Sequence, residues 1–406
     1  MQRVLEKVTP KLALMLTLLL VWGYFARPIY DFTWIALHRV KDKIGEKNNP
    51  WFAMPVEDLV ALNSQLVTET DTYIAERRSQ SASDPLLATM ASAKTTAEYA
   101  TASEGLRNVL HQTFGYPLAD AVRGNDFSSV QQKLLGEDEL ATYTALVIPA
   151  LGGADTTMIN CVGILIVPKN HAPAMPLIIA AHGRGGMPAA TGKINLMQAH
   201  NRDLAAGAIR RGWAVFEPIY LFYGKNQPEN IRDILTVRAQ QVGLSLPAIE
   251  FTKTQRSIDY LLTRPEFDAS RVAMVGISYG GFNTLYTTAL DPRIRAAVVA
   301  AYFNKREDIL ENSGPFGFYD WRFSHSLGLL RDPQVAALIC PRPLQIQAGT
   351  QDQLFPIEGA RETFPAAREY YRQLGLESRF DYHEFAGRHD FDGEAAWTFL
   401  EGVFAR

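Results

Sequence analysis

Apolar and polar positions divide the chain into two alternating kinds of segment from about residue 141 onward. Short, continuous apolar runs are typical of strands that are buried on both faces of a parallel sheet. These runs cover 142–149, 159–167, 176–181, 213–218, 271–277, 295–301, 342–348 and 379–385. Segments with helical spacing fall near 199–211, 252–264, 279–290, 359–374 and 393–404. The alternation predicts an α/β fold with a mainly parallel, eight-stranded sheet that carries helices on both faces.

Residues 27–140 have a different, mostly helical pattern and carry no catalytic signature. Asp84 is a candidate N-cap, and Pro85 suits the first helical position. Apolar residues then recur until Gly115-Tyr116-Pro117 ends the pattern. We expect a helical accessory region that covers one side of the catalytic domain, which we place at 141–406.

The first 26 residues form a third segment. Arg3, Lys7 and Lys11 precede the apolar run 12–26, and a basic flank before such a run is typical of a secretory signal. Tyr24 and Phe25 crowd the expected cleavage site, and aromatic residues there also suit the interfacial end of a membrane anchor. A cleaved signal peptide, an uncleaved anchor and a buried helix stay open as alternatives. The first two predict export to the periplasm or the extracellular space, with attachment to the membrane through the N-terminus in the case of an anchor.

Gly276-Ile277-Ser278-Tyr279-Gly280 is a G-x-S-x-G motif between a predicted strand and a predicted helix. A strand that turns sharply into a helix needs small residues where the backbones crowd, and the turn lifts the central hydroxyl above the sheet. The motif and its context therefore predict a nucleophile elbow with Ser278 at its tip.

A serine nucleophile needs a histidine base and a carboxylate that orients the base. Asp352 lies just past the predicted strand 342–348, and His389 lies in the loop after 379–385. His383 also follows Asp352 in the chain, but it lies inside a predicted strand, where packing is its expected role. The neighbouring carboxylates Asp390 and Asp392 are too close to His389 in sequence to reach around and orient its ring. We therefore predict a Ser278–Asp352–His389 triad.

An acyl-transfer site also needs two fixed donors for the developing negative oxygen. We expect one from the backbone N–H of Tyr279, directly after the nucleophile. The apolar run 176–181 ends in His182-Gly183-Arg184-Gly185-Gly186, where glycines let the backbone approach a substrate closely. We expect the second donor in this loop and favour Arg184. A phosphate-binding P-loop does not fit, because Ile194 stands where Ser or Thr is required.

Aromatic residues near the predicted site suggest a substrate pocket. Segment 303–337 is a long insertion between the sixth and seventh predicted strands and is a candidate lid. Phe303 and Trp321 in this insertion, with Tyr220 and Tyr223 after the fourth strand, are candidates for the pocket wall. Aromatic residues are also ordinary core material, so both roles stay open.

Composition narrows the class of protein. The 406 residues are 47% hydrophobic and 20% charged, as in an ordinary globular enzyme. A net charge of −3 offers no broad basic surface for nucleic acid. We expect the two cysteines, Cys161 and Cys340, to be small buried residues rather than a disulfide. The eight histidines are scattered and no H-E-x-x-H motif is present, which argues against a metallohydrolase.

The motifs HGRGG, GISYGG, PRPLQIQAGTQDQLFP and GRHDF together resemble the α/β-hydrolase superfamily, and within it the dienelactone-hydrolase-like and acetyl-xylan-esterase-like enzymes. The resemblance covers about 140–406 and implies a carboxylic-ester hydrolase that uses Ser278, Asp352 and His389 and no metal or organic cofactor. Dienelactone hydrolases proper carry a cysteine nucleophile, so the serine here favours simple esters over lactones of that type.

Short-acyl or carbohydrate esters, cleaved through an acyl-enzyme, are the expected substrates. A serine peptidase of the prolyl-oligopeptidase type is the alternative. It usually brings a large propeller domain, for which the residues ahead of the catalytic part are too few and too helical.

Overall fold

The computed structural model describes residues 56–80, 85–115, 121–152, 157–184, 204–221, 231–312, 321–323, 327 and 330–405. The chain divides into two units, Met1–Ala75 and Glu76–Arg406. Helix α3 (Val56–Gln80) supplies all of the first unit that is described. The predicted signal or anchor at 1–26 lies outside the described residues. Among the helices that are described, none combines the length and the apolar character that crossing a membrane requires.

The second unit is built on one nine-stranded sheet in the order β1-β2-β3-β5-β4-β6-β7-β8-β9. The strands are β1 (Gln131–Glu137), β2 (Ala141–Leu151), β3 (Ile159–Pro168), β4 (Met175–Ala181), β5 (Ala214–Pro218), β6 (Phe267–Ile277), β7 (Ala296–Ala300), β8 (Leu344–Gly349) and β9 (Phe380–Phe385). All neighbours from β5 to β9 pair in parallel, and the pairs β1–β2, β2–β3 and β3–β5 are antiparallel. The predicted α/β fold with a mainly parallel sheet is confirmed.

The predicted number of eight strands is wrong by one, because β1 was not anticipated. Its sequence QQKLLGE has neither an apolar run nor an alternating pattern, and nearly all of its residues are exposed at the edge of the sheet. Pairing with β2 supplies its backbone hydrogen bonds, with a register shift between Leu134 and Gly136. Residues 131–137 therefore belong to the sheet and not to the helical region predicted for 27–140.

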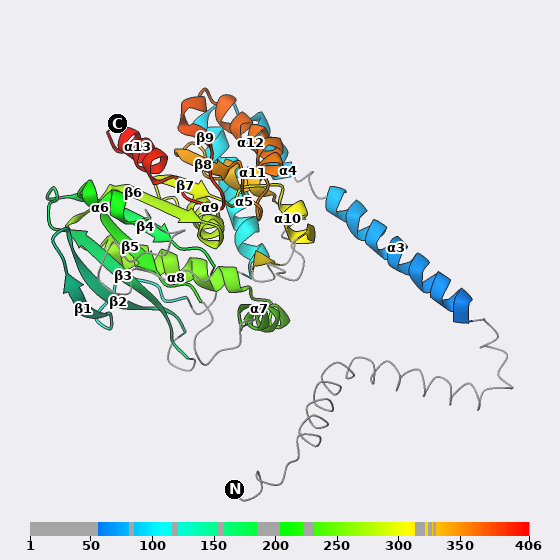
Figure 1. The fold of residues 1–406 in the computed structure, drawn as a ribbon, viewed down its shortest axis with the longest axis horizontal. Coiled ribbons are helices and arrows are strands. Elements are labelled where there is room, and N and C mark those ends of the chain that lie inside the picture. Colours follow the sequence, from blue (N-terminus) through cyan, green and yellow to red (C-terminus); the bar gives the residue numbers. More distant parts are fainter. Residues whose placement is uncertain are drawn as a thin grey trace, which may run out of the picture. The chain divides into compact units, whose positions relative to one another are not determined.

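Helices cover both faces of the sheet (Figure 1). One face packs against α8 (Leu246–Leu261), α9 (Tyr279–Leu290), α11 (Asp332–Ala337) and α12 (Ile357–Arg372), and the other against α6 (Ala206–Arg210) and α13 (Gly393–Phe404). Alternate residues of β4 enter the two cores: Leu177 and Ile179 pack on the α8–α9 side, and Ile178 and Ala180 on the α6–α13 side. This double burial explains the continuous apolar run of β4. Helices α7 (Ile231–Gln241) and α10 (Arg306–Asn312) lie in the connections from β5 to β6 and from β7 to β8.

The helical pattern predicted to run from Asp84 to Gly115 is two helices, α4 (Pro85–Ser92) and α5 (Thr96–Thr113). The chain breaks because Thr95 caps α5: its side chain accepts from the N–H of Glu98, whose carboxylate accepts in return from the N–H of Thr95. Helix α5 packs on the catalytic part through Tyr99, whose hydroxyl donates to the carbonyl of Ala337 at 2.8 Å. Helix α5 thus lies against α11 of the catalytic part (Figure 1), and the wider expectation that residues 27–140 cover one side of that part stays a prediction.

Candidate active site

Ser278 lies at the tip of the turn between β6 and α9, as the motif predicts. Its backbone has φ 59° and ψ −122°, a region that is strained for a residue with a side chain. Its N–H donates to the carbonyl of Ala300 at 2.9 Å, which ties the turn to the neighbouring strand β7. A strained, well-fixed serine between a strand and a helix is the geometry of a nucleophile elbow.

Glycines permit the crowding around this turn. A Cβ atom on Gly280 would overlap the carbonyl oxygen of Ala181, and one on Gly276 would overlap the carbonyl of Gly280. Gly183, just after β4, lies against Ser278: a Cβ there would be 3.4 Å from Ser278 Cβ and 4.0 Å from Ser278 Oγ. The loop after β4 therefore passes directly beside the serine.

Asp352 and His389 form a hydrogen-bonded pair. His389 Nδ1 lies 2.8 Å from Asp352 Oδ2, and the Asp352 side chain is 1% exposed against 23% for His389. The other carboxylate oxygen, Oδ1, accepts from the N–H groups of Leu354 at 2.8 Å and Phe355 at 3.0 Å. An ionised carboxylate only accepts, so Nδ1 carries the proton and Nε2 is left as the basic nitrogen.

The loops that carry this pair are joined by backbone contacts. The N–H of Thr350 donates to the carbonyl of Phe385 at 2.9 Å, and that of Gln351 donates to the carbonyl of Gly387 at 2.8 Å. The ring of Phe355 stacks on the His389 imidazole with a centroid distance of 5.6 Å. The His389 imidazole is thus held by a carboxylate, an aromatic ring and its own loop.

Ser278, Asp352 and His389 follow β6, β8 and β9, which are parallel strands of one sheet. All three residues therefore lie at the carboxyl ends of the strands, on the same side of the sheet. The structure pairs His389 with Asp352, but among the described residues it records no hydrogen bond from His389 to Ser278. Such catalytic hydrogen bonds are often long before a substrate binds. The participation of Ser278 in a triad therefore stays a prediction.

Of the two predicted oxyanion residues, Tyr279 directly follows Ser278 in the chain, and Arg184 follows Gly183, which lies against Ser278. Tyr279 is the first residue of α9 and is buried, and its hydroxyl donates a hydrogen bond to the Glu250 carboxylate. The side chain of Arg184 pairs with Asp233 of α7, with Nη2 3.3 Å from Oδ1. The assignment of the second donor to the Arg184 amide stays a prediction, because residues 185 and 186 of this loop lie outside the described part.

Three of the four predicted pocket residues are buried. Tyr220 is 1% exposed and Phe303 and Trp321 are each 2% exposed, while Tyr223 lies outside the described residues. Trp321 stacks on Phe355, the ring that also contacts His389, at 5.6 Å. In this conformation these aromatics form the core beneath the site, and their role in a substrate pocket stays a prediction.

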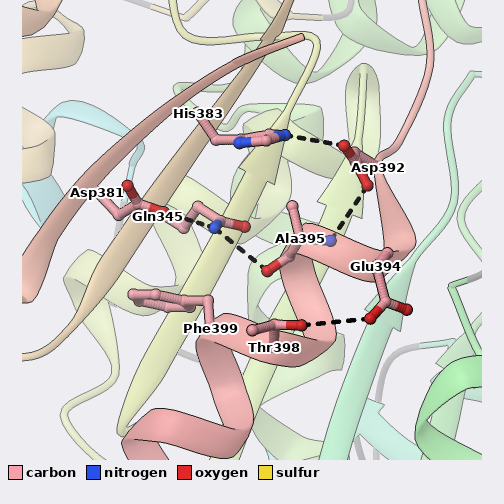
Figure 2. A pocket seen from close by; sticks show the side chains of 8 residues that line it. All are labelled: Gln345, Asp381, His383, Asp392, Glu394, Ala395, Thr398 and Phe399. Atoms are coloured by element: carbon pink, nitrogen blue, oxygen red, sulfur yellow. Dashed lines mark hydrogen bonds and ion pairs between the residues drawn. The ribbon is translucent and has the colours of Figure 1, made fainter.

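A second histidine–aspartate pair lies at the edge strand β9, where only packing was expected of His383. Its Nε2 is 2.8 Å from Asp392 Oδ2. Figure 2 shows the two side chains facing one another in an open cleft of about 440 Å³. Asp392 also caps α13, and its backbone exchanges hydrogen bonds with Gln347 of β8 at 2.8 Å and 3.0 Å. His383 therefore helps to fasten the end of the loop that carries His389, a role that has no signature in the sequence.

Cys161 and Cys340 are free and buried, as predicted. Within the described part of the chain, no three His, Cys, Asp or Glu side chains are grouped to hold a metal ion.

The fold and the strand-to-helix serine define the protein as an α/β-hydrolase. The sequence profile of the dienelactone hydrolase family matches residues 163–396, which is more than half of the chain. The chain therefore belongs to the dienelactone hydrolase family.

One curated relative is also named as a hydrolase. A curated relative, "Putative hydrolase YtaP" of Bacillus subtilis (strain 168), is 30% identical over 111 residues, which are 25% of this chain and 35% of the relative. The chain thus matches only about a third of the length of that relative.

Solved structures with the same fold are esterases by name. The "putative acetyl xylan esterase" of Bacteroides fragilis NCTC 9343 has a TM-score of 0.60 at 13% identity, with 77% of this chain and 89% of that chain covered. Acetyl xylan esterase 1 of Thermoanaerobacterium sp. JW/SL YS485 has a TM-score of 0.51 at 16% identity, covering 74% and 93%. A glucuronoyl esterase of Solibacter usitatus also has 0.51 at 16% identity, covering 76% and 93%. At these identities the likeness establishes the fold, and with the family match it makes the protein a hydrolase of the dienelactone hydrolase family.

Proposed function

We propose that the protein is a serine carboxylic-ester hydrolase that uses Ser278, Asp352 and His389 and acts on short-acyl or carbohydrate esters through an acyl-enzyme. The observation that carries the proposal is the strained Ser278 at the sheet edge where Asp352 orients His389. A buried carboxylate that fixes Nδ1–H leaves Nε2 free to take a proton, which is the one task that a serine nucleophile requires of its partner.

The reaction has two steps. His389 Nε2 removes the proton of Ser278 Oγ as this oxygen attacks the ester carbonyl carbon, and the negative oxygen accepts from the N–H of Tyr279 and an amide of the loop at 183–185. The alcohol leaves with the proton from His389, and water then repeats the sequence on the acyl-enzyme. No step requires a metal or an organic cofactor.

The names of the structural neighbours support the proposed substrate class. Two of the structural neighbours are named for acetyl xylan and one for glucuronoyl esters, at 13–16% identity. A carbohydrate ester is therefore the natural first substrate to test, beside simple short-acyl esters.

The test is a p-nitrophenyl ester series of increasing acyl length, run beside acetylated xylan and an aminoacyl-proline amide. We expect fast cleavage of short esters. Rapid cleavage of the amide with inert esters would instead assign the protein to the prolyl-oligopeptidase-type peptidases.

The two histidine–aspartate pairs supply a matched control for the site. Ser278→Ala and His389→Ala should each lower ester turnover by about 10³-fold or more, and the double variant should be scarcely worse, because the residues act as a unit. His383→Ala removes an equally short pair and should change turnover only a few-fold. A fluorophosphonate probe should label Ser278. Labelling of another serine, or a crippled His383→Ala beside an active His389→Ala, would overturn the assignment.

A further inference from the structure

A buried carboxylate joins three segments behind the nucleophile elbow. Glu250 of α8 is 0% exposed and receives two hydrogen bonds from the guanidinium of Arg232, one to each oxygen at 3.1 Å. It also accepts from the N–H of Leu221, after β5, at 3.0 Å and from the hydroxyl of Tyr279. One carboxylate thus links α7, the segment after β5 and the first residue of α9.

The surroundings of Glu250 favour its charged form although the side chain is buried. Burial alone would raise the pKa of the Glu250 carboxyl, but the charge and hydrogen bonds of Arg232, with the nearby Lys253 and Tyr279, lower it. Arg232 is 3% exposed, and its guanidinium carbon lies 4.3 Å from the centroid of the Tyr279 ring. A buried ion pair is often no more stable than apolar residues of the same volume, so stability alone gives no reason for charges at this place.

The contacts of the pair lead to both predicted oxyanion donors. Tyr279 itself carries the first donor, its backbone N–H, and its side chain is held by Glu250 and Arg232.

A second series of contacts leads from Glu250 toward the loop that carries the other predicted donor. Leu221, whose N–H donates to Glu250, follows Tyr220, whose N–H donates to His182 Nε2 at 3.1 Å. The other nitrogen of His182 is 2.8 Å from the carbonyl of Gly183, the residue that lies against Ser278. A series of contacts thus connects Glu250 to the loop after β4 as well as to the elbow.

We propose that Glu250 and Arg232 are positioning residues that fix the Tyr279 amide and the 183–184 segment relative to Ser278 Oγ, and so preorganise the oxyanion hole. The inference rests on the proposed esterase function. Fixed donors stabilise the transition state more than the bound substrate, so the pair should act on kcat and leave KM nearly unchanged.

The first test compares Glu250→Leu and Tyr279→Phe with the wild-type full-length chain on a short p-nitrophenyl ester. Glu250→Leu should lower kcat by about 10- to 100-fold with KM within about 3-fold, because the donors remain but are no longer held. Tyr279→Phe keeps the ring and the backbone amide and loses only the hydroxyl on Glu250, so we expect a kcat about 3- to 10-fold lower. Affinity for phenylboronic acid, which forms a tetrahedral adduct on the serine, should fall by the same factors as kcat. Unchanged kcat in both variants, or effects confined to KM, would overturn the inference.

A double variant separates positioning from stability. Glu250→Leu orphans the buried Arg232 charge and should lower the thermal midpoint, and adding Arg232→Met removes that charge and should raise the midpoint again. If the pair positions the donors, kcat stays low in the double variant. If kcat recovers together with the midpoint, the pair is only structural. The control is Asp259, which lies on the same helix α8 and pairs with Arg256 and Arg293. Asp259→Asn removes the negative charge of these pairs and should leave kcat unchanged.

Hydrogen exchange tests the positioning role of Glu250 and Arg232 independently of the proposed esterase activity. In the double variant the amides of Tyr279 and of 183–184 should exchange faster than in the wild type, whatever the substrate is. Unchanged exchange would overturn the positioning role. A wild-type protein that neither cleaves esters nor reacts with fluorophosphonate at Ser278 would instead overturn the esterase proposal.

Discussion

His182, the first residue after β4, shows how the site fixes the protonation state of a single side chain. It is 4% exposed, and the N–H of Tyr220 donates to its Nε2. A backbone N–H cannot accept, so Nε2 is unprotonated and Nδ1–H donates to the carbonyl of Gly183. Burial lowers the pKa of His182 to about 4, against the opposing effects of the Gly183 carbonyl and of Glu250. The loop beside Ser278 therefore depends on a neutral imidazole.

This pKa predicts a loss of stability in mild acid. The unfolded chain binds a proton at His182 below pH 6.5 and the folded chain only below about pH 4, so stability falls as the pH drops through this window. The difference amounts to about 3 kcal/mol at its full extent. Urea unfolding at pH 7 and pH 4.5 should show this loss in the wild type. His182→Gln, which can still accept from Tyr220, should be less stable at pH 7 but lose less on acidification. An equal loss in both proteins would show that another group is responsible.

At the same scale, hydrogen-bond partners that belong to recognisable motifs can be predicted from the sequence. Partners that only the fold brings together cannot. The pairing of Asp352 with His389 was predictable because each residue lies in a loop directly after a strand, and the carboxyl ends of parallel strands lie next to one another. The pairing of Glu250 with Arg232 was not predictable, because charged residues in helical segments are usually exposed and nothing local marks them as buried. His383 was missed as a partner of Asp392 because its position inside a strand indicated only a packing role.

At the scale of the element, the strands with strong apolar runs were predictable and the elements held by their neighbours were not. β4 is apolar throughout because both of its faces are buried, whereas β1 exists through its pairing with β2. The spacing of Thr95 and Glu98 is that of a capping box and indicates a helix start. The apolar pattern continues across this position, however, and it led to the prediction of one helix instead of two.

The same substitution should have opposite effects in two helices. Gly402 of α13 is exposed and a Cβ there meets no atom within 4 Å, so Gly402→Ala should stabilise the protein by about 0.5–1 kcal/mol through higher helix propensity. Gly280 of α9 faces the carbonyl of Ala181, which belongs to the central strand β4 and cannot move aside. Gly280→Ala should cost about 3 kcal/mol or more, or prevent folding. Thermal unfolding of both variants is the measurement, and an unperturbed Gly280→Ala would contradict the close approach of the elbow to β4.

At the scale of the whole molecule, the proposed chemistry belongs entirely to the unit Glu76–Arg406. The described residues of its apolar cores start at Leu87, and Ser278, Asp352 and His389 all lie after residue 270. The basic flank and apolar run at 1–26 lie in the other unit, and we propose that they direct export of the protein.

Removal of residues 1–26 should therefore yield a soluble and active esterase, because none of the described core or site residues lies in the deleted segment. Fractionation of cells that make the full chain then distinguishes the alternatives for this segment. Full-length protein in the membrane fraction would identify an anchor, and a shorter soluble species outside the cytoplasm would identify a cleaved signal peptide. Full-length protein that is soluble in the cytoplasm, together with a truncated form that aggregates, would show that the run is a core helix and that the export proposal is wrong.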